Sequence, residues 1–154
     1  MPKHPHTYTR LMLGFGLATV LFALLPILRF DDVSYRGYTL IFGRTLIDIS
    51  PFGLDTIAAA RLPFSGAALG AFVLPLLGGL IILVHRQLAM VSLACFLVGL
   101  FLQWSLTEQV QIAYTLFGTE RTMHVDWIRM GGLYGAMLMT LFGGITSMLL
   151  AMKS

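Results

Sequence analysis

Apolar residues along the chain gather into four long runs, which are separated by segments where polar residues are frequent. A helix needs about 20 apolar residues to cross the hydrocarbon core of a bilayer, and each run approaches or reaches that length. The interiors of the runs hold no Asp, Glu or Lys. The pattern therefore predicts four transmembrane helices, at about 11–28, 64–84, 88–106 and 128–152.

The first outer loop, about 30–63, has a pattern typical of strands. Residues 33–41 are rich in the β-branched and aromatic side chains that strands favour, and 45–49 has the same character. A turn that contains Gly43 separates these two segments. We therefore expect a β-hairpin here, followed by a short surface helix over 53–62 whose apolar residues share one face.

The second outer loop, about 107–127, begins without a helix breaker. Residues 107–117 contain neither Gly nor Pro, so we expect the third helix to continue beyond the membrane as far as Gly118. Asp126 stands just before the fourth run and has a side chain that suits an N-cap.

Together these elements predict an all-α membrane protein: a four transmembrane helix bundle with a small β-hairpin in the first outer loop, forming one integral membrane domain over 1–154. Four helices, a β-rich first loop and a long third helix resemble the claudin-type tetraspan architecture. The resemblance is topological and covers most of the chain. The outer loops lack the W-G-L-W stretch and the two cysteines of the claudin signature, so the resemblance implies a topology and no family function.

Composition supports lipid as the solvent. Hydrophobic residues make up 57% of the chain and charged residues 11%, with a mean hydropathy of +0.84, whereas a soluble domain is roughly 45–50% apolar and about 25% charged. These values exclude a soluble enzyme, a disordered tail and a secreted disulfide scaffold. The one cysteine, Cys95, excludes an internal disulfide and a Cys-rich zinc site.

The charges are distributed unequally between the two sides of the predicted bundle. One side holds both termini and the short turn 85–87, and it contains basic residues but no acid. The other side holds all the acidic residues, together with six arginines. Because an even number of spans keeps the termini together and the short tails are dense in positive charge, we expect both termini to be cytoplasmic. Short loops and few lysines favour a bacterial inner membrane.

Small residues recur at a spacing of four in two of the predicted helices. Such residues let helices approach closely in lipid, where no hydrophobic effect drives them together. We expect these faces to pack within the chain, with dimerisation or docking to another membrane subunit as the alternative. The positions are Gly66 and Gly70 in the second helix, and Gly132, Ala136, Thr140 and Gly144 in the fourth.

Residues for catalysis or cofactor binding are scarce. Membrane enzymes and pumps usually keep ionisable groups inside the bilayer, and the predicted spans hold none in their interiors. No histidine falls within a span, so the sequence predicts no haem, no other cofactor and no metal site. Aromatic and basic side chains in the first outer loop are instead candidates for contact with a partner or a lipid headgroup, or simply solvated residues: Tyr35, Arg36, Tyr38 and Arg44.

The sequence is therefore best interpreted as a non-catalytic polytopic membrane protein, acting as an accessory, scaffold or assembly subunit of a membrane complex. Its expected partners are membrane lipids and another membrane protein, or a second copy of the chain. Scattered basic residues argue against nucleic acid. One alternative is a small oligomeric channel or transporter. A second is a membrane enzyme acting on a lipid-like substrate at the outer face, with the polar groups Asp31, Asp32, Glu120, His124 and Asp126.

Overall fold

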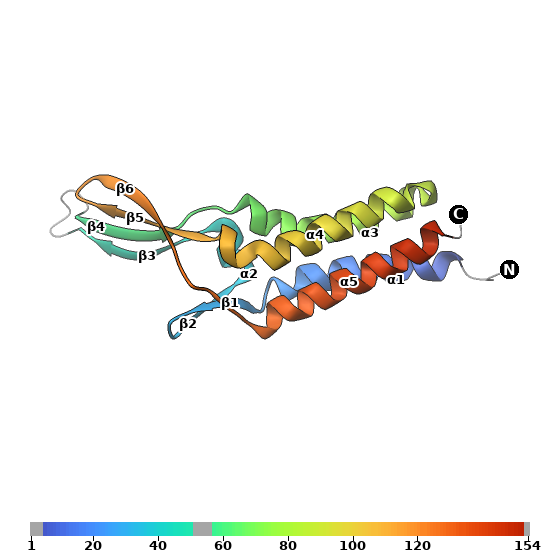
Figure 1. Cartoon of the computed structure of the whole chain (residues 1–154), viewed down its shortest axis with the longest axis horizontal. Helices are drawn as coiled ribbons and strands as arrows, with labels where there is room; N and C mark the ends of the chain where they lie inside the picture. Colours follow the sequence, from blue (N-terminus) through green and yellow to red (C-terminus); the bar gives the residue numbers. More distant parts are fainter. Residues whose placement is uncertain (1–4, 51–56, 153–154) are drawn as a thin grey trace.

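Long helices occupy one end of the molecule and two antiparallel sheets occupy the other, in a computed structural model that describes residues 5–50 and 57–152 (Figure 1). The chain begins and ends at the helical end, so both sheets lie at the end of the molecule away from the termini. The long helices are α1 (Pro5–Phe22), α3 (Gly66–Val84), α4 (Ala89–Gln109) and α5 (Gly131–Ala151).

These helices lie alongside one another. Helices α1 and α4 each pack against both α3 and α5. A 3-10 turn, η2 (Arg86–Leu88), joins α3 to α4 at the end near the termini. The first turn of α3 is capped by Ser65, whose Oγ accepts a hydrogen bond from the backbone N–H of Ala68.

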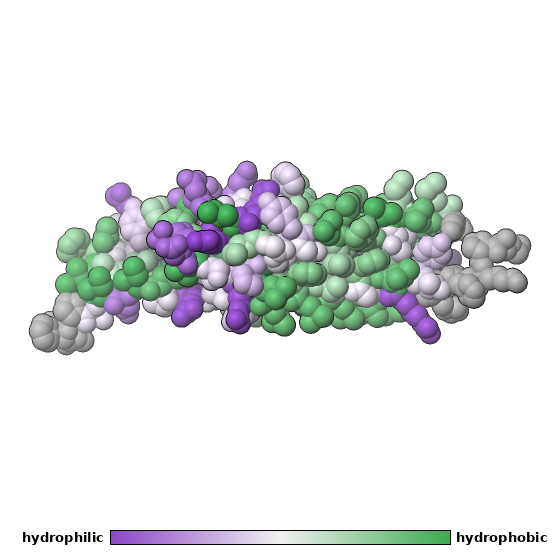
Figure 2. Space-filling view, turned by 90° about the horizontal axis from the view of Figure 1, so that it is seen from below, coloured by the Kyte–Doolittle hydropathy of each residue, from purple (hydrophilic) through white to green (hydrophobic). Residues whose placement is uncertain are grey.

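Three helices, α3, α4 and α5, are long and apolar enough to cross a membrane. The apolar stretch of α1, Thr7–Phe22, is shorter. Leucines, valines and phenylalanines point outward along α3, α4 and α5, and hydrophobic side chains cover much of the helical end in Figure 2. This end of the molecule therefore presents the apolar surface that a lipid environment requires.

The prediction of an all-α, four transmembrane helix bundle is wrong. The fold is mixed, with 61% of the described residues helical and 24% in strands, and only three helices qualify as spans. The first predicted span, 11–28, divides into α1 and a strand, because the helix ends at Phe22 and Pro26 begins extended backbone. Proline lacks the N–H that a continuing helix would need.

Sheet A has the strand order β2-β1-β7 and connects the two outer segments of the chain. Strand β1 pairs on one side with β2 and on the other with β7, which directly precedes α5. The backbone N–H of Met130 also donates to the carbonyl of Ile27. The strands are β1 (Pro26–Phe30), β2 (Val33–Arg36) and β7 (Ile128–Arg129).

Sheet B has the order β3-β4-β5-β6 and is antiparallel throughout. Strands β4 and β5 pair with each other although α3 and α4 separate them in the chain. A short helix, α2 (Gly37–Phe42), connects the two sheets. The strands are β3 (Arg44–Ile49), β4 (Ala58–Leu62), β5 (Gln111–Leu116) and β6 (Thr119–His124).

The predicted outer elements are wrong in detail. Residues 33–41 and 45–49 do not form a hairpin, because β2 pairs with β1 and β3 pairs with β4. The surface helix expected over 53–62 is a strand where the structure describes it, and 53–56 lie outside the described residues. The third helix ends at Gln109, and the N-cap of α5 is Met130 instead of Asp126.

Polar side chains inside the helical end connect the helices by hydrogen bonds. The Nε2 of Gln103 in α4 donates to the carbonyl of Ala71 in α3 (2.8 Å) and to Oγ1 of Thr140 in α5 (2.9 Å). The Thr140 oxygen also lies 3.3 Å from Oγ1 of Thr19 in α1. The Oε1 of Gln103 has no hydrogen-bond partner among the described residues. One buried amide of α4 therefore contacts both α3 and α5, and Thr140 extends the contact to α1, in a region where unpaired polar groups are costly.

The structure turns the predicted small-residue stripe of α5 toward the interior. Gly132, Ala136, Thr140 and Gly144 are all buried in the chain's own packing. Gly70 lies against Leu102 of α4, whereas the only side chain near Gly66 is that of Phe64, which precedes the helix. Among the predicted packing glycines, the closest approach is at Gly132, where an added Cβ would overlap the carbonyl oxygen of Pro26.

The variant Gly132→Ala should lower the free energy of unfolding by about 1–3 kcal/mol, because overpacking against backbone displaces β1 from α5. The neighbouring Gly131→Ala is the matched control, since a Cβ there meets nothing within 4 Å. Thermal unfolding of both variants in detergent micelles measures the difference. Equal thermal unfolding midpoints for the two variants would contradict the close contact between Gly132 and Pro26.

Candidate functional site

A cleft of about 480 Å³ lies between the β1–β2 hairpin and one face of sheet B. Its size falls in the range of small-molecule sites, and its lining is largely apolar with a few polar groups, as in such sites. The apolar side chains are Phe30 and Val33 from the hairpin, and Leu46, Ile47, Ala60, Ile112 and Met123 from sheet B. The polar lining residues are Asp31, Tyr35, Arg44 and Thr45.

Sheet B is amphipathic, which explains why the cleft is apolar. Residues that pair directly across antiparallel strands point to the same face. Ile47, Ala60 and Tyr114 occupy one row of such pairs, which ends at Arg121 in the edge strand β6, and Ile112 pairs with Met123 on the same face. The next row along the sheet, on the opposite face, contains Asp48, Ala59, Thr115 and Glu120. The hairpin therefore covers part of an apolar face and leaves the rest uncovered.

Trp127 fixes the hairpin that forms the other wall of the cleft. Its ring meets those of Tyr35 and Phe30 edge to face, with centroids 5.4 Å and 5.9 Å apart. Its indole Nε1 donates to the carbonyl of Val110, just beyond the end of α4 (2.8 Å). Because Trp127 is itself buried, the hairpin is held in place by packing and by one buried hydrogen bond.

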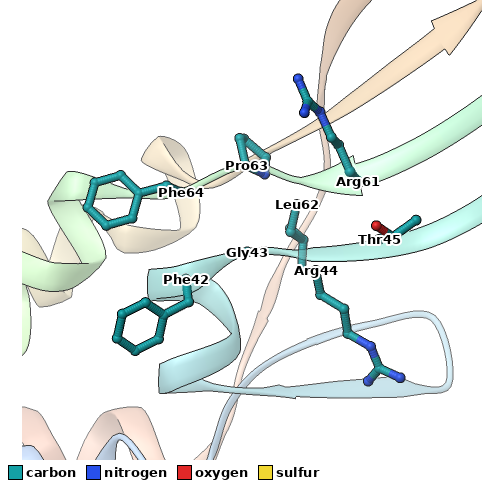
Figure 3. A pocket seen from close by; sticks show the side chains of 8 residues that line it. All are labelled: Phe42, Gly43, Arg44, Thr45, Arg61, Leu62, Pro63 and Phe64. Carbon is teal, nitrogen blue, oxygen red and sulfur yellow. The ribbon is translucent and has the colours of Figure 1, made fainter.

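Arg44 lies where the cleft meets a second, more open groove of about 580 Å³ at the boundary between sheet B and the helices (Figure 3). The rings of Phe42 and Phe64 lie on the helical side of this groove and are 73% and 60% exposed. The guanidinium groups of Arg44 and Arg61 extend to opposite sides of the sheet. The two arginines therefore do not converge on one ligand.

Gly43 allows the close approach of strands at this groove. Its φ of +81° is a conformation that glycine adopts without strain, and an added Cβ would overlap the carbonyl oxygen of Leu62. The backbone N–H of Gly43 donates to the carbonyl of Thr39 and ends α2. This glycine positions Arg44 as the first residue of β3, beside the cleft.

Two of the four predicted contact residues meet at the cleft. Tyr35 and Arg44 both line it, whereas Arg36 and Tyr38, at the end of β2 and in α2, do not. Sequence reasoning missed the apolar members from β5 and β6, chief among them Ile112 and Met123. Residues 119–124 contain a single apolar side chain, Met123, so no alternation of apolar and polar residues marks this strand or its partner.

The polar groups considered for an enzyme do not form a catalytic cluster. Asp32 pairs with Arg29 (3.0 Å), and Glu120 pairs with Arg61 across β5 (2.6 Å). Across 5–50 and 57–152, no three His, Cys, Asp or Glu side chains come together in a way that would hold a metal ion. Of the candidate groups, only Asp31 lines the cleft.

Comparison with known proteins identifies no relative. The chain matches no protein-family model, no curated protein sequence and no solved structure. What supports a function is therefore the surface of the molecule itself: the cleft, and the part of sheet B that extends beyond it.

The variant Trp127→Phe should lower the free energy of unfolding by about 1–3 kcal/mol, since it removes the donor to a buried carbonyl and leaves the space of the larger ring. Trp104→Phe is the control, because the Trp104 ring is exposed and contacts the guanidinium of Arg129 (4.7 Å from its carbon to the ring centroid). Trp104→Phe should lower the free energy of unfolding by no more than about 1 kcal/mol. Near-ultraviolet circular dichroism during thermal unfolding compares the two variants, and a larger loss in Trp104→Phe would contradict this assignment.

Proposed function

We propose that this protein is a non-catalytic accessory or assembly subunit of a membrane complex, and that it binds another membrane protein through the distal tip of sheet B. The distal tip is defined here as four apolar residues at the end of the sheet away from the helices: Ile49, Ile57, Leu116 and Phe117. The proposal rests on what these residues share, which is the exposure of their apolar side chains.

Hydrogen bonds bring the distal tip together from three parts of the chain. The N–H of Ile57 donates to the carbonyl of Ile49, and the N–H of Phe117 donates to the carbonyl of Ile57. All four side chains are more than two-fifths exposed, and Phe117 is 84% exposed. Hydrophobic side chains are visible toward this end of the molecule in Figure 2. Exposed apolar clusters of this kind mark interaction surfaces.

Phe117 provides the observation that carries the proposal. It occupies the first turn position of the β5–β6 hairpin at a φ of +48°, followed by Gly118 at +78°. A two-residue turn with both φ values positive favours Asn-Gly or Asp-Gly, and a bulky residue there is an outlier. Strained residues of this kind cluster at functional sites. Phe117 therefore keeps an exposed aromatic ring at a position where the ring lowers the stability of the turn. Aromatic side chains of this kind often dominate binding contacts.

The free edges of sheet B support the same proposal. Among the described residues, β3 pairs only with β4, and β6 pairs only with β5. Strand edges of this kind accept an added strand from a partner. Neither edge strand contains proline, and both carry charged residues, including Asp48 and Arg121, which limit non-specific pairing. The tip and the edges together form a surface suited to an extended segment of a partner.

We further propose that the sheets lie on the outer side of a bacterial inner membrane, with both ends of the chain in the cytoplasm. The short turn that contains Arg86 and the N-terminal segment with Arg10 carry positive charge without acids, and such bias orients membrane helices. Placing a partner-binding sheet outside the cell also separates it from the termini, which lie at the other end of the molecule.

The variant Phe117→Asn should raise the free energy of unfolding by about 1 kcal/mol, because it relieves the left-handed strain of a bulky residue, and should abolish partner binding. Phe117→Tyr is the control, since it keeps the aromatic ring and should keep the partner. Affinity purification in mild detergent, with quantitative mass spectrometry of the proteins retained, reads out binding. A partner that Phe117→Asn retains in full would overturn the assignment of the tip.

Cysteine labelling tests the sidedness. In a Cys95→Ser background, a cysteine at exposed Thr122 of β6 should react with a membrane-impermeant maleimide on intact cells. A cysteine at exposed Met152, after α5, should react only after the cells are opened. The reverse pattern would place the sheets in the cytoplasm.

A further inference from the structure

We infer that the cleft between the sheets takes up an acyl chain of a phospholipid from the adjoining membrane leaflet, with the lipid phosphate against Arg44. This site is separate from the distal tip, so it goes beyond the proposed partner-binding function. Three features carry it: an apolar cleft, an arginine that pairs with no other described residue, and two exposed aromatic rings on the helical side of the adjoining groove.

The chemistry of the cleft fits an amphiphile. Its walls are apolar side chains from both sheets, with Ile112 and Tyr35 buried at its base. The guanidinium of Arg44 and the hydroxyl of Tyr35 form no hydrogen bond or ion pair with another described residue. Arginine binds phosphate oxygens in a planar, bidentate arrangement. The cleft therefore offers an apolar space for a chain and, where it meets the open groove, the guanidinium of Arg44 as a donor for an anionic head.

The position of Arg44 connects the cleft to the membrane. Arg44 and Thr45 line both the cleft and the open groove of Figure 3. On the helical side of that groove stand the exposed rings of Phe42 and Phe64, and Phe64 is two residues before α3, a candidate span. Exposed rings at this level suit contact with lipid. An acyl chain can thus pass from the leaflet over the two rings and enter the cleft beside Arg44.

Asp31 indicates which headgroup fits best. Asp31 also lines the cleft. Its charge is opposite to that of Arg44, and the two side chains form no ion pair with each other. A headgroup that carries an amine beside its phosphate, as in a phosphoethanolamine lipid, would place opposite charges near both side chains. A headgroup with a net negative charge would satisfy Arg44 alone. The cleft should therefore prefer the amine-bearing head.

Trp127 provides a spectroscopic probe of the cleft. It packs against Tyr35 and Phe30, which both line the cleft, and it lies before β7 and α5, outside the apolar helices. The chain has two tryptophans, so Trp104→Phe leaves Trp127 as the single emitter. Bromine on an acyl chain quenches tryptophan fluorescence only at short range. Quenching of Trp127 therefore reports a chain that has entered the cleft.

The experiment uses the full-length Trp104→Phe protein in nanodiscs, with a small fraction of brominated lipid in place of the ordinary one. Brominated phosphatidylethanolamine should quench Trp127 saturably. Arg44→Ala should weaken this quenching about tenfold in apparent affinity, as expected when one charge-assisted contact is lost. Arg36→Ala is the matched control, because Arg36 does not line the cleft, and it should leave the quenching unchanged. Ala60→Phe, which fills the cleft, should abolish it.

Two further arms define the ligand. Brominated phosphatidylglycerol should quench about threefold less well, and Asp31→Asn should remove this difference, as expected for one exposed charge pair. Brominated free fatty acid should compete poorly with either lipid. Quenching with unchanged affinity in Arg44→Ala, or any saturable quenching in Ala60→Phe, would overturn the inference, and so would quenching by free fatty acid alone. Phe117→Asn should leave lipid quenching intact, so failure at the tip and failure at the cleft are distinguishable.

Discussion

The position of the sheets relative to the helices depends on Trp127. The residue stands between β6 and β7, yet its indole hydrogen-bonds the end of α4 and its ring packs on the β1–β2 hairpin. It therefore connects three segments that are far apart in sequence at the boundary where apolar helices meet polar sheets. A ring with one donor suits this place because it fills apolar space and satisfies a carbonyl that α4 leaves unpaired. The cleft has a defined shape because this contact holds one of its walls.

The helices could be predicted from the sequence more reliably than the strands. In lipid, an uninterrupted apolar segment forms a helix, because a helix satisfies its own backbone N–H and C=O groups by hydrogen bonds within the segment. This is why α3, α4 and α5 lie close to the predicted spans. The sequence predicts helix at β1 because Ile27 and Leu28 continue an apolar run, and both side chains are fully buried in the structure. Apolar pattern alone does not separate a buried strand from a buried helix.

The errors in the outer segments share one cause, which is pairing between distant residues. Ala58–Leu62 contains three alanines, the best helix formers, and is nevertheless a strand because β3 and β5 flank it on both sides. The predicted hairpin of 33–41 with 45–49 would pair segments that are neighbours in sequence. In the structure, β2 pairs with β1 and β3 pairs with β4. For the same reason Tyr35 and Arg44 could be named as candidate contact residues from their chemistry, but the cleft that holds them could not. The wall opposite the β1–β2 hairpin combines β3 with residues of β4, β5 and β6.

The pairing of β4 with β5 also sets an order of assembly during synthesis. The residues between these strands form α3 and α4, so both helices must be inserted before β5 can reach β4. Until then β4 has an open edge on the side where β5 pairs in the finished sheet. Contacts between distant segments form late because the intervening chain must first be ordered. Sheet B is thus complete only after α3 and α4 have brought their ends together, and the cleft that uses its face arises only in a chain whose helices are already packed.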